Sequence, residues 1–166
     1  MRARTLTVLT AALAAVLLSI YLAVEPMANR GEEAGFEDGV VRVKSAYAFR
    51  ETVERLKKDV AAKGILMFSE IDQARLAADA GIALRPSTLL VFGNPPLGVQ
   101  FITSRAEAGL DWPVRLLVHE DGSGQVWTAY TDFAWIARRH RIKDREQAFK
   151  MASGVIASIA ASVAAK

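Results

Sequence analysis

Hydrophobic residues follow different patterns along the chain, and each pattern predicts a different element. Residues 5–24 contain no charged side chain, and this run is long enough for a helix that crosses a bilayer. Between residues 40 and 142, short apolar runs alternate with amphipathic stretches, as expected for the strands and helices of one folded domain. Residues 143–166 place apolar side chains at helical spacing, which predicts a C-terminal helix that packs on the domain or on a dimer partner.

Short apolar runs predict about five strands, at residues 40–43, 65–68, 87–92, 114–120 and 125–130. We expect the compact second run to be buried, and the third, rich in leucine and valine, to be central. The last two runs flank Asp121-Gly122-Ser123-Gly124, a pattern typical of a β-hairpin.

Capping residues predict where the helices between these strands begin. The expected N-caps are Ser45, Asp72, Asn94 (before Pro95), Asp132 and Asp144. Gly64 and Gly81 are expected to end the first two helices. The pattern as a whole predicts an α+β fold, a single mixed or antiparallel sheet of about five strands with helices packed on one face.

The charges around residues 5–24 predict the orientation of this membrane segment. Arg2 and Arg4 precede it and acidic residues follow it, so residues 1–4 form a cytoplasmic basic stub and the domain lies outside the cytoplasm, in a periplasmic or extracellular location. Residues 25–39, rich in glycine and acids, are expected to be a flexible tether. The alternative is a cleaved signal peptide and a secreted form, but Pro26-Met27-Ala28 places proline where cleavage needs a small residue.

Composition limits the chemistry. The chain has no cysteine, which excludes disulfides, thiolate metal sites and cysteine nucleophiles. The two histidines lie far apart in sequence, so we expect no metal site and no cofactor. The formal net charge of +3 gives no case for nucleic-acid binding.

Several motifs, in order and spacing, resemble those of one known family. They are Glu70-Ile71-Asp72, Ala80-Gly81-Ile82-Ala83-Leu84-Arg85-Pro86, Thr88-Leu89-Leu90-Val91-Phe92-Gly93-Asn94-Pro95, Trp112-Pro113, Asp121-Gly122 with Gly124, and Val126-Trp127 through Tyr130. Over residues 40–142 the chain resembles the family called domain of unknown function 302. The resemblance implies a small α+β domain that pairs as a homodimer, and it supplies no reaction. Family members often have a histidine after Ile-Asp, whereas this chain has Gln73, so no histidine role is carried over here.

The candidate ligand-binding residues surround the central predicted strand. They are Asp72, Arg85, Thr88, Gly93, Asn94 and Tyr130. Each has a structural alternative: Asp72 caps a helix, and Arg85 pairs with a nearby aspartate. In the same way, Thr88 bonds the neighbouring backbone, the Gly93-Asn94 pair forms a tight turn, and Tyr130 fills the core.

These features lead us to expect a membrane-anchored, homodimeric binding module for a small anionic ligand. An enzyme of unknown reaction, with Asp72 as general base and Arg85 holding an anion, is one alternative. A structural or interaction domain of an envelope complex is the other. The basic run that includes Arg138, Arg139, Arg141 and Lys143 is also a candidate for contact with anionic lipid, or else a solvated helix end.

Overall fold

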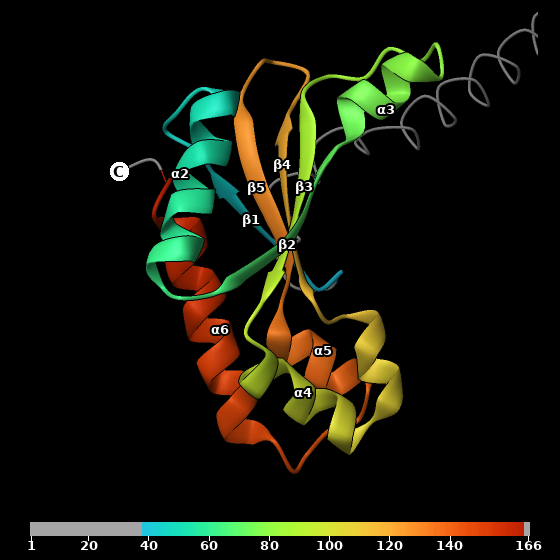
Figure 1. Cartoon of the computed structure of the whole chain (residues 1–166), viewed down its shortest axis with the longest axis vertical. Helices are drawn as coiled ribbons and strands as arrows, with labels where there is room; N and C mark the ends of the chain where they lie inside the picture. Colours follow the sequence, from blue (N-terminus) through green and yellow to red (C-terminus); the bar gives the residue numbers. More distant parts are fainter. Residues whose placement is uncertain (1–37, 165–166) are drawn as a thin grey trace, which may run out of the picture. The chain divides into compact units, whose positions relative to one another are not determined.

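A single antiparallel sheet organises residues 38–164, the part of the chain that the structure, a computed structural model, describes (Figure 1). The strands are β1 (Val40–Lys44), β2 (Leu66–Asp72), β3 (Ser87–Gly93), β4 (Val114–Glu120) and β5 (Val126–Thr131). They lie in the order β1-β5-β4-β3-β2, and every neighbouring pair is antiparallel. The alternative of a mixed sheet therefore does not apply.

Helices cover one face of this sheet and one of its ends. They are α2 (Phe49–Ala62), α3 (Gln73–Asp79), α4 (Pro95–Ser104), the 3-10 helix η1 (Ala106–Leu110), α5 (Phe133–Arg139) and α6 (Glu146–Ala161). Helices α2 and α6 run along the sheet, and α4 and α5 gather at its lower end (Figure 1). Helix α3 does not cover the sheet face and lies beside the upper end of β3. The predicted α+β fold with a single sheet is confirmed.

Strand alternation builds the core between the sheet and these helices. On β3 and β4, four apolar side chains that point to the inner face are at most 1% exposed: Leu90, Phe92, Leu116 and Val118. Leu56 and Val60 of α2 and Ile156 and Ile159 of α6 pack against them. Helix α6 thus buries its apolar side on its own domain. At the lower end, Phe101 and Phe149 stack with ring centroids 4.2 Å apart.

Several local predictions are confirmed. Strands β4 and β5 form the expected hairpin, and residues 121–125 connect them. Asp72 caps α3 by accepting a hydrogen bond from the Arg75 N–H at 2.9 Å. Asp132 caps α5 by accepting hydrogen bonds from the backbone of Ala134 and Trp135.

The prediction that the second strand is buried is wrong. Leu66, Met67 and Phe68 are 54%, 36% and 46% exposed. The reason is position, because β2 is the edge strand and pairs only with β3. A bulge between Met67 and Ser69 also shifts the register of the pair. An apolar run cannot reveal whether a second strand will lie beside it.

Three predicted caps act differently. The Ser45 hydroxyl bonds Tyr47 and Thr52, while α2 begins only at Phe49. Asn94 occupies the N-cap position of α4 but makes no capping bond through its side chain. The last helix begins at Glu146 after Arg145, because Asp144 instead accepts a hydrogen bond from Ser104 at 2.6 Å.

The membrane segment predicted at residues 5–24, the stub before it and most of the tether lie outside the described residues. Within residues 38–164, no helix combines the length and hydropathy that crossing a bilayer requires.

Candidate functional site

The six expected ligand-binding residues do not converge on one place. Asp72 and Thr88 are cross-strand partners and line a groove beside α2. Gly93 and Asn94 line a cavity at the other end of β3. From Thr88 to Gly93 the strand runs roughly 17 Å, since each residue advances about 3.4 Å. The remaining two, Arg85 and Tyr130, line neither the groove nor the cavity.

The groove between α2 and the β2–α3 segment has an acidic wall. It measures about 630 Å³ and is lined by Glu54, Glu70 and Asp72 against one basic residue, Arg50. Lys57 lies beside it and pairs with Glu70 at 2.8 Å and with Glu54 at 3.0 Å. The hydrogen bonds to Glu70 and then Glu54 raise the pKa of Lys57 above its ordinary value. An anion entering this groove would meet excess negative charge.

The polar residues at this end of β3 are engaged in holding α3. The Asp72 carboxylate is used as the cap of that helix. Gln73 accepts a hydrogen bond from the Ser87 hydroxyl at 2.7 Å. This contact ties the start of α3 to β3. Asp72 and Gln73 therefore both have a structural role, which is to hold α3 in place.

Arg85 and Tyr130 also take structural positions. The Arg85 guanidinium lies 3.7 Å from the Glu120 carboxylate, so its partner is neither Asp72 nor Asp79. Its side chain is 56% exposed, and the pair therefore contributes little. Tyr130 is only 8% exposed on the inner face of β5. Burial, followed by the charge of Asp132, raises the pKa of its phenol.

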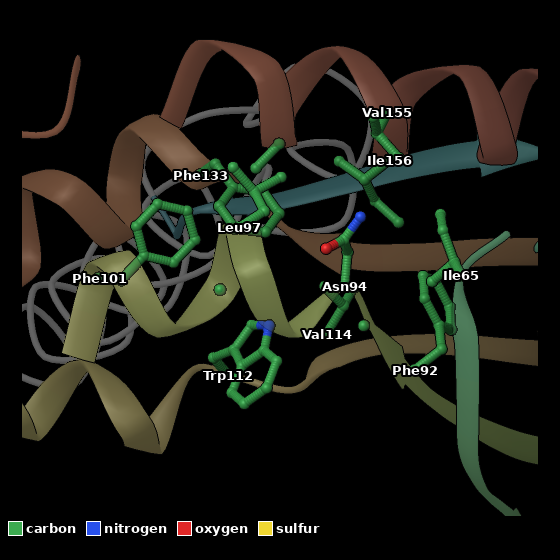
Figure 2. A pocket seen from close by; sticks show the side chains of 13 residues that line it. Ile65, Phe92, Asn94, Leu97, Phe101, Trp112, Val114, Phe133, Val155 and Ile156 are labelled. Atoms are coloured by element: carbon green, nitrogen blue, oxygen red, sulfur yellow. The ribbon is translucent and has the colours of Figure 1, made fainter. Parts of the chain in front are cut away.

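A second, smaller cavity lies at the other end of β3 (Figure 2). It measures about 40 Å³ and lies where β3, α4 and α6 meet. Its walls are aromatic and aliphatic, and no charged residue lines it. They include Ile65, Phe92, Leu97, Phe101, Trp112, Val114, Phe133, Val155 and Ile156.

Polar groups from two side chains line this otherwise apolar cavity. The Asn94 amide is directed toward Val155 and Ile156 on α6 (Figure 2). The indole of Trp112 lies on the opposite side of α4, close to Gly93 and Gly98. Among the described residues, neither side chain has a hydrogen-bond partner, whereas Trp127 donates to Asp121 at 2.8 Å. Asn94 is exposed, however, and no buried side-chain nitrogen or oxygen atom of the described residues is left unsatisfied.

The start of α4 does not offer an anion cradle. Pro95 and Pro96 have no N–H group, and the next two N–H groups, of Leu97 and Gly98, donate to the Asn94 carbonyl oxygen. A helix N-terminus attracts anions through free N–H groups, and here the first turn has none. The Pro-Pro pair therefore shapes the turn without adding donors.

Trp112 is the functional candidate that sequence reasoning missed. In the sequence it stands out only as part of the Trp112-Pro113 motif, whose peptide bond is cis. Gly93 and Gly98 leave the space that its ring occupies, because a Cβ atom at either position would press on the indole. Two glycines five residues apart, followed by a distant tryptophan, give no local signal of this contact.

Metal-binding geometry is also missing from the described part of the chain, where no group of three or more histidine, aspartate and glutamate side chains is placed to hold an ion.

Comparison with known proteins decides the family. The family model for domain of unknown function DUF302 matches residues 41–159. The chain belongs to the DUF302 family. A solved structure, an uncharacterized conserved DUF302 protein from Bacillus stearothermophilus, superposes with a TM-score of 0.69 at 14% identity. It covers 75% of this chain and 98% of that one, and at this identity it shows the DUF302 fold alone.

Curated relatives of this DUF302 chain are named as channels. The fluoride-specific ion channel FluC 1 of Brucella suis biovar 1 is 39% identical over 106 residues, which cover 64% of this chain and 42% of the relative. FluC 1 of Brucella abortus biovar 1 is 39% identical over 106 residues and is covered to 39%. The DUF302 chain thus spans about two-fifths of the length of the relatives it matches.

Proposed function

We propose that this DUF302 chain is a membrane-anchored, homodimeric module that binds a small, uncharged ligand in the cavity between β3, α4 and α6. One observation carries the proposal. The cavity is apolar, yet two polar groups stand at its wall, the Trp112 indole N–H and the amide of the exposed Asn94, and neither has a partner among the described residues. An apolar pocket with a few placed polar groups is the usual form of a small-molecule site.

The chemistry of the walls favours an uncharged ligand over the anion expected from the sequence. An anion in an apolar cavity loses its hydration, and only a cation or several donors restore that loss. No charged side chain lines this cavity, and the groove at Asp72 is acidic. A mainly apolar molecule with one hydrogen-bond acceptor would satisfy the indole donor at little cost in desolvation.

The size of the cavity limits the part of the ligand that enters it. A volume of about 40 Å³ exceeds what one water needs but is well below the roughly 150 Å³ that holds benzene. The buried part of the ligand is therefore a few heavy atoms, such as a short alkyl or carbonyl group. A larger ligand requires the Trp112 ring to move.

Native mass spectrometry of the full-length chain, purified from its own membrane, tests this site. We expect a copurified small molecule that is reduced in Trp112→Phe and Asn94→Ala. Trp127→Phe is the matched control, because that indole donates to Asp121 in the β4–β5 turn. A ligand held equally by all three variants, or no ligand in the wild-type chain, would remove the support for this site.

The β2–α3 segment supports the homodimer. Exposed apolar side chains gather between residues 66 and 84, where α3 has no buried residue. They are Leu66, Met67, Phe68, Leu76, Ile82 and Leu84. An uncovered edge strand with apolar side chains is a surface that native proteins ordinarily pair or cover. A second copy of the chain, placed by a two-fold axis, would cover it.

Light scattering of the purified chain tests the dimer. We expect a dimer for the wild-type chain and a monomer for Leu66→Glu or Phe68→Glu. Met151→Glu is the control, because Met151 is 55% exposed but lies on α6. If the edge-strand variants remain dimeric, the partner covers another surface.

We also propose that residues 5–24 anchor the chain and leave the domain outside the cytoplasm. The uncharged run and the two arginines before it support this orientation. Relatives named as ion channels, which work in membranes, add support for a membrane setting. Retention in the membrane after carbonate washing, with the domain cut by protease added from outside, is the expected result. A full-length chain recovered freely soluble from cytosol would refute the anchor.

A second candidate function follows from those relatives. The 39% identity to FluC proteins favours a module that serves an anion channel in the same membrane. Deleting this chain should then lower fluoride tolerance of the cells, and the Trp112→Phe variant should restore it less well than Trp127→Phe. Unchanged tolerance in the deletion strain would set this candidate aside.

A further inference from the structure

Positive charge collects at one end of the domain. Residues 105–115 and 138–150 carry eight lysines and arginines against four acids, a net charge of +4. The other described residues carry nine basic against ten acidic side chains, a net charge of −1. The basic residues follow α4, α5 and the start of α6, at the lower end in Figure 1. We call this region the basic end.

Five of the eight lysines and arginines at the basic end have no ion pair among the described residues, against four of the nine elsewhere. On α2, Arg55, Lys57 and Lys63 each pair with a nearby carboxylate. At the basic end, exposed cations without an ion-pair partner among the described residues are Arg105, Arg138, Arg141, Lys143 and Lys150. Unpaired charge of one sign gathered on one region attracts a surface of the opposite sign.

Asp111 does not neutralise these exposed cations, because its buried carboxylate is already paired with other residues. Its carboxylate is 2% exposed and accepts hydrogen bonds from Arg115 and Arg139 at 3.1 Å. It also bonds the buried His140 ring at 2.6 Å. Arg139, one of the cations expected to touch lipid, is therefore bound to Asp111. The cations around it remain available.

The described chain also begins beside the basic end. Gly39 accepts a hydrogen bond from the Asp132 N–H at 2.8 Å and lies against the Trp135 ring on α5. The last turn of α5 carries Arg138, one helical turn of about 5.4 Å further along. A tether that connects the membrane to residue 38 would therefore place α5 and its neighbours closer to the membrane than the rest of the domain.

We propose that the basic end docks on the anionic phospholipid headgroups of the membrane that anchors the chain. This inference rests on the proposed anchor, and it adds an orientation. Arg105, Arg138, Arg141, Lys143 and Lys150 face the headgroups, with the 65% exposed Leu110 of η1 among them. The β4–β5 turn points away, because it lies at the opposite end of the strands that lead to α5.

Full-length chain reconstituted in vesicles tests the orientation. The chain has no cysteine, so a fluorophore can be placed through Gln147→Cys at the basic end or Ser123→Cys in the hairpin turn. The vesicles contain phosphatidylcholine with or without phosphatidylglycerol, and a headgroup-attached quencher reports proximity. We expect strong quenching at position 147 only with phosphatidylglycerol, reduced by high salt, and weak quenching at position 123.

Charge reversal supplies the decisive comparison. Each of Arg138→Glu, Arg141→Glu and Lys143→Glu should lower the ratio of docked to undocked chain at least fivefold, because a basic residue at an anionic surface contributes about 1 kcal/mol. Lys58→Glu on α2 is the matched control and should leave the ratio unchanged. Equal quenching at positions 147 and 123 would overturn the proposal. So would docking that persists when Arg138→Glu, Arg141→Glu and Lys143→Glu are combined in one chain. Failure of the chain to stay in phosphatidylcholine vesicles would instead refute the anchor.

Discussion

A Cβ atom at Gly98 would overlap the indole nitrogen of Trp112, so α4 and this ring approach more closely than any side chain at position 98 permits. At Gly93, a Cβ atom would lie 3.1 Å from the same nitrogen. Two glycines at the end of β3 and the start of α4 therefore set where the indole lies. The cavity keeps its wall because both positions lack a side chain.

Replacing Gly98 should disturb the cavity and the stability of the fold together. Gly98→Ala forces Trp112 or α4 to move, and overpacking of this kind costs about 1–3 kcal/mol. Urea unfolding and tryptophan emission would measure the loss and the displacement of the ring. Gly154→Ala is the control, because nothing lies within 4 Å of a Cβ atom there. Alanine in α6 should stabilise by up to about 1 kcal/mol, and an equal loss in both variants would contradict the argument.

The two aspartate caps should differ in their global effect. Asp132→Ala should lower the free energy of unfolding by about 1 kcal/mol, because α5 buries Phe133 and Ile136. Asp72→Ala should leave it nearly unchanged, because α3 has no buried residue. Faster hydrogen exchange confined to α3 is the expected sign of the lost cap. Equal global losses would show that α3 is coupled to the core.

Removing the buried carboxylate of Asp111 should be costly. Asp111→Ala leaves His140, Arg115 and Arg139 without their shared acceptor, and a lost hydrogen bond to a charged group costs about 2 kcal/mol. Chemical unfolding would measure this loss. Asp144→Ala removes an exposed pair with Arg145 and an exposed hydrogen bond from Ser104, and it should change the free energy less than Asp111→Ala does. If both variants lost a similar free energy of unfolding, burial of the Asp111 carboxylate would not explain its contribution to stability.

Asp121 should make stability depend on pH in acid. Hydrogen bonds from Ser123 and then Trp127 hold the pKa of its carboxyl well below the ordinary value of 3.8. A lowered pKa in the folded state adds stability that is complete above the ordinary value and is lost as pH falls toward the folded-state pKa. The advantage of the wild-type chain over Asp121→Asn should therefore shrink below about pH 4. A difference that stays constant in unfolding curves between about pH 6 and about pH 3 would refute this assignment.

Local patterns predicted the hairpin and two helix starts because their causes lie within a few residues. Asp121 accepts hydrogen bonds from the backbone of Ser123 and Gln125, so the turn is specified by its own sequence. The caps at Asp72 and Asp132 act in the same way over two or three residues. Asp144 behaved differently because Ser104, forty residues earlier, bonds its carboxylate.

The expected ligand site is divided because closeness in sequence does not imply closeness in the fold. Thr88 and Gly93 belong to one strand, and an extended strand separates its ends. Arg85 met Glu120 because β3 and β4 pair antiparallel, which brings residues far apart in sequence together. Trp112 joined Gly98 through packing alone.

The amino-acid sequence by itself determined the family, the α+β class and the local turns and caps, since alternation, turn residues and capping side chains act over a few positions. Only the tertiary structure decided that β2 lies at the edge, that Trp112 closes the cavity and that unpaired cations share one end. Each of these depends on contacts between segments distant in the chain. Such contacts follow from how strands order and helices pack, which no short stretch of residues specifies.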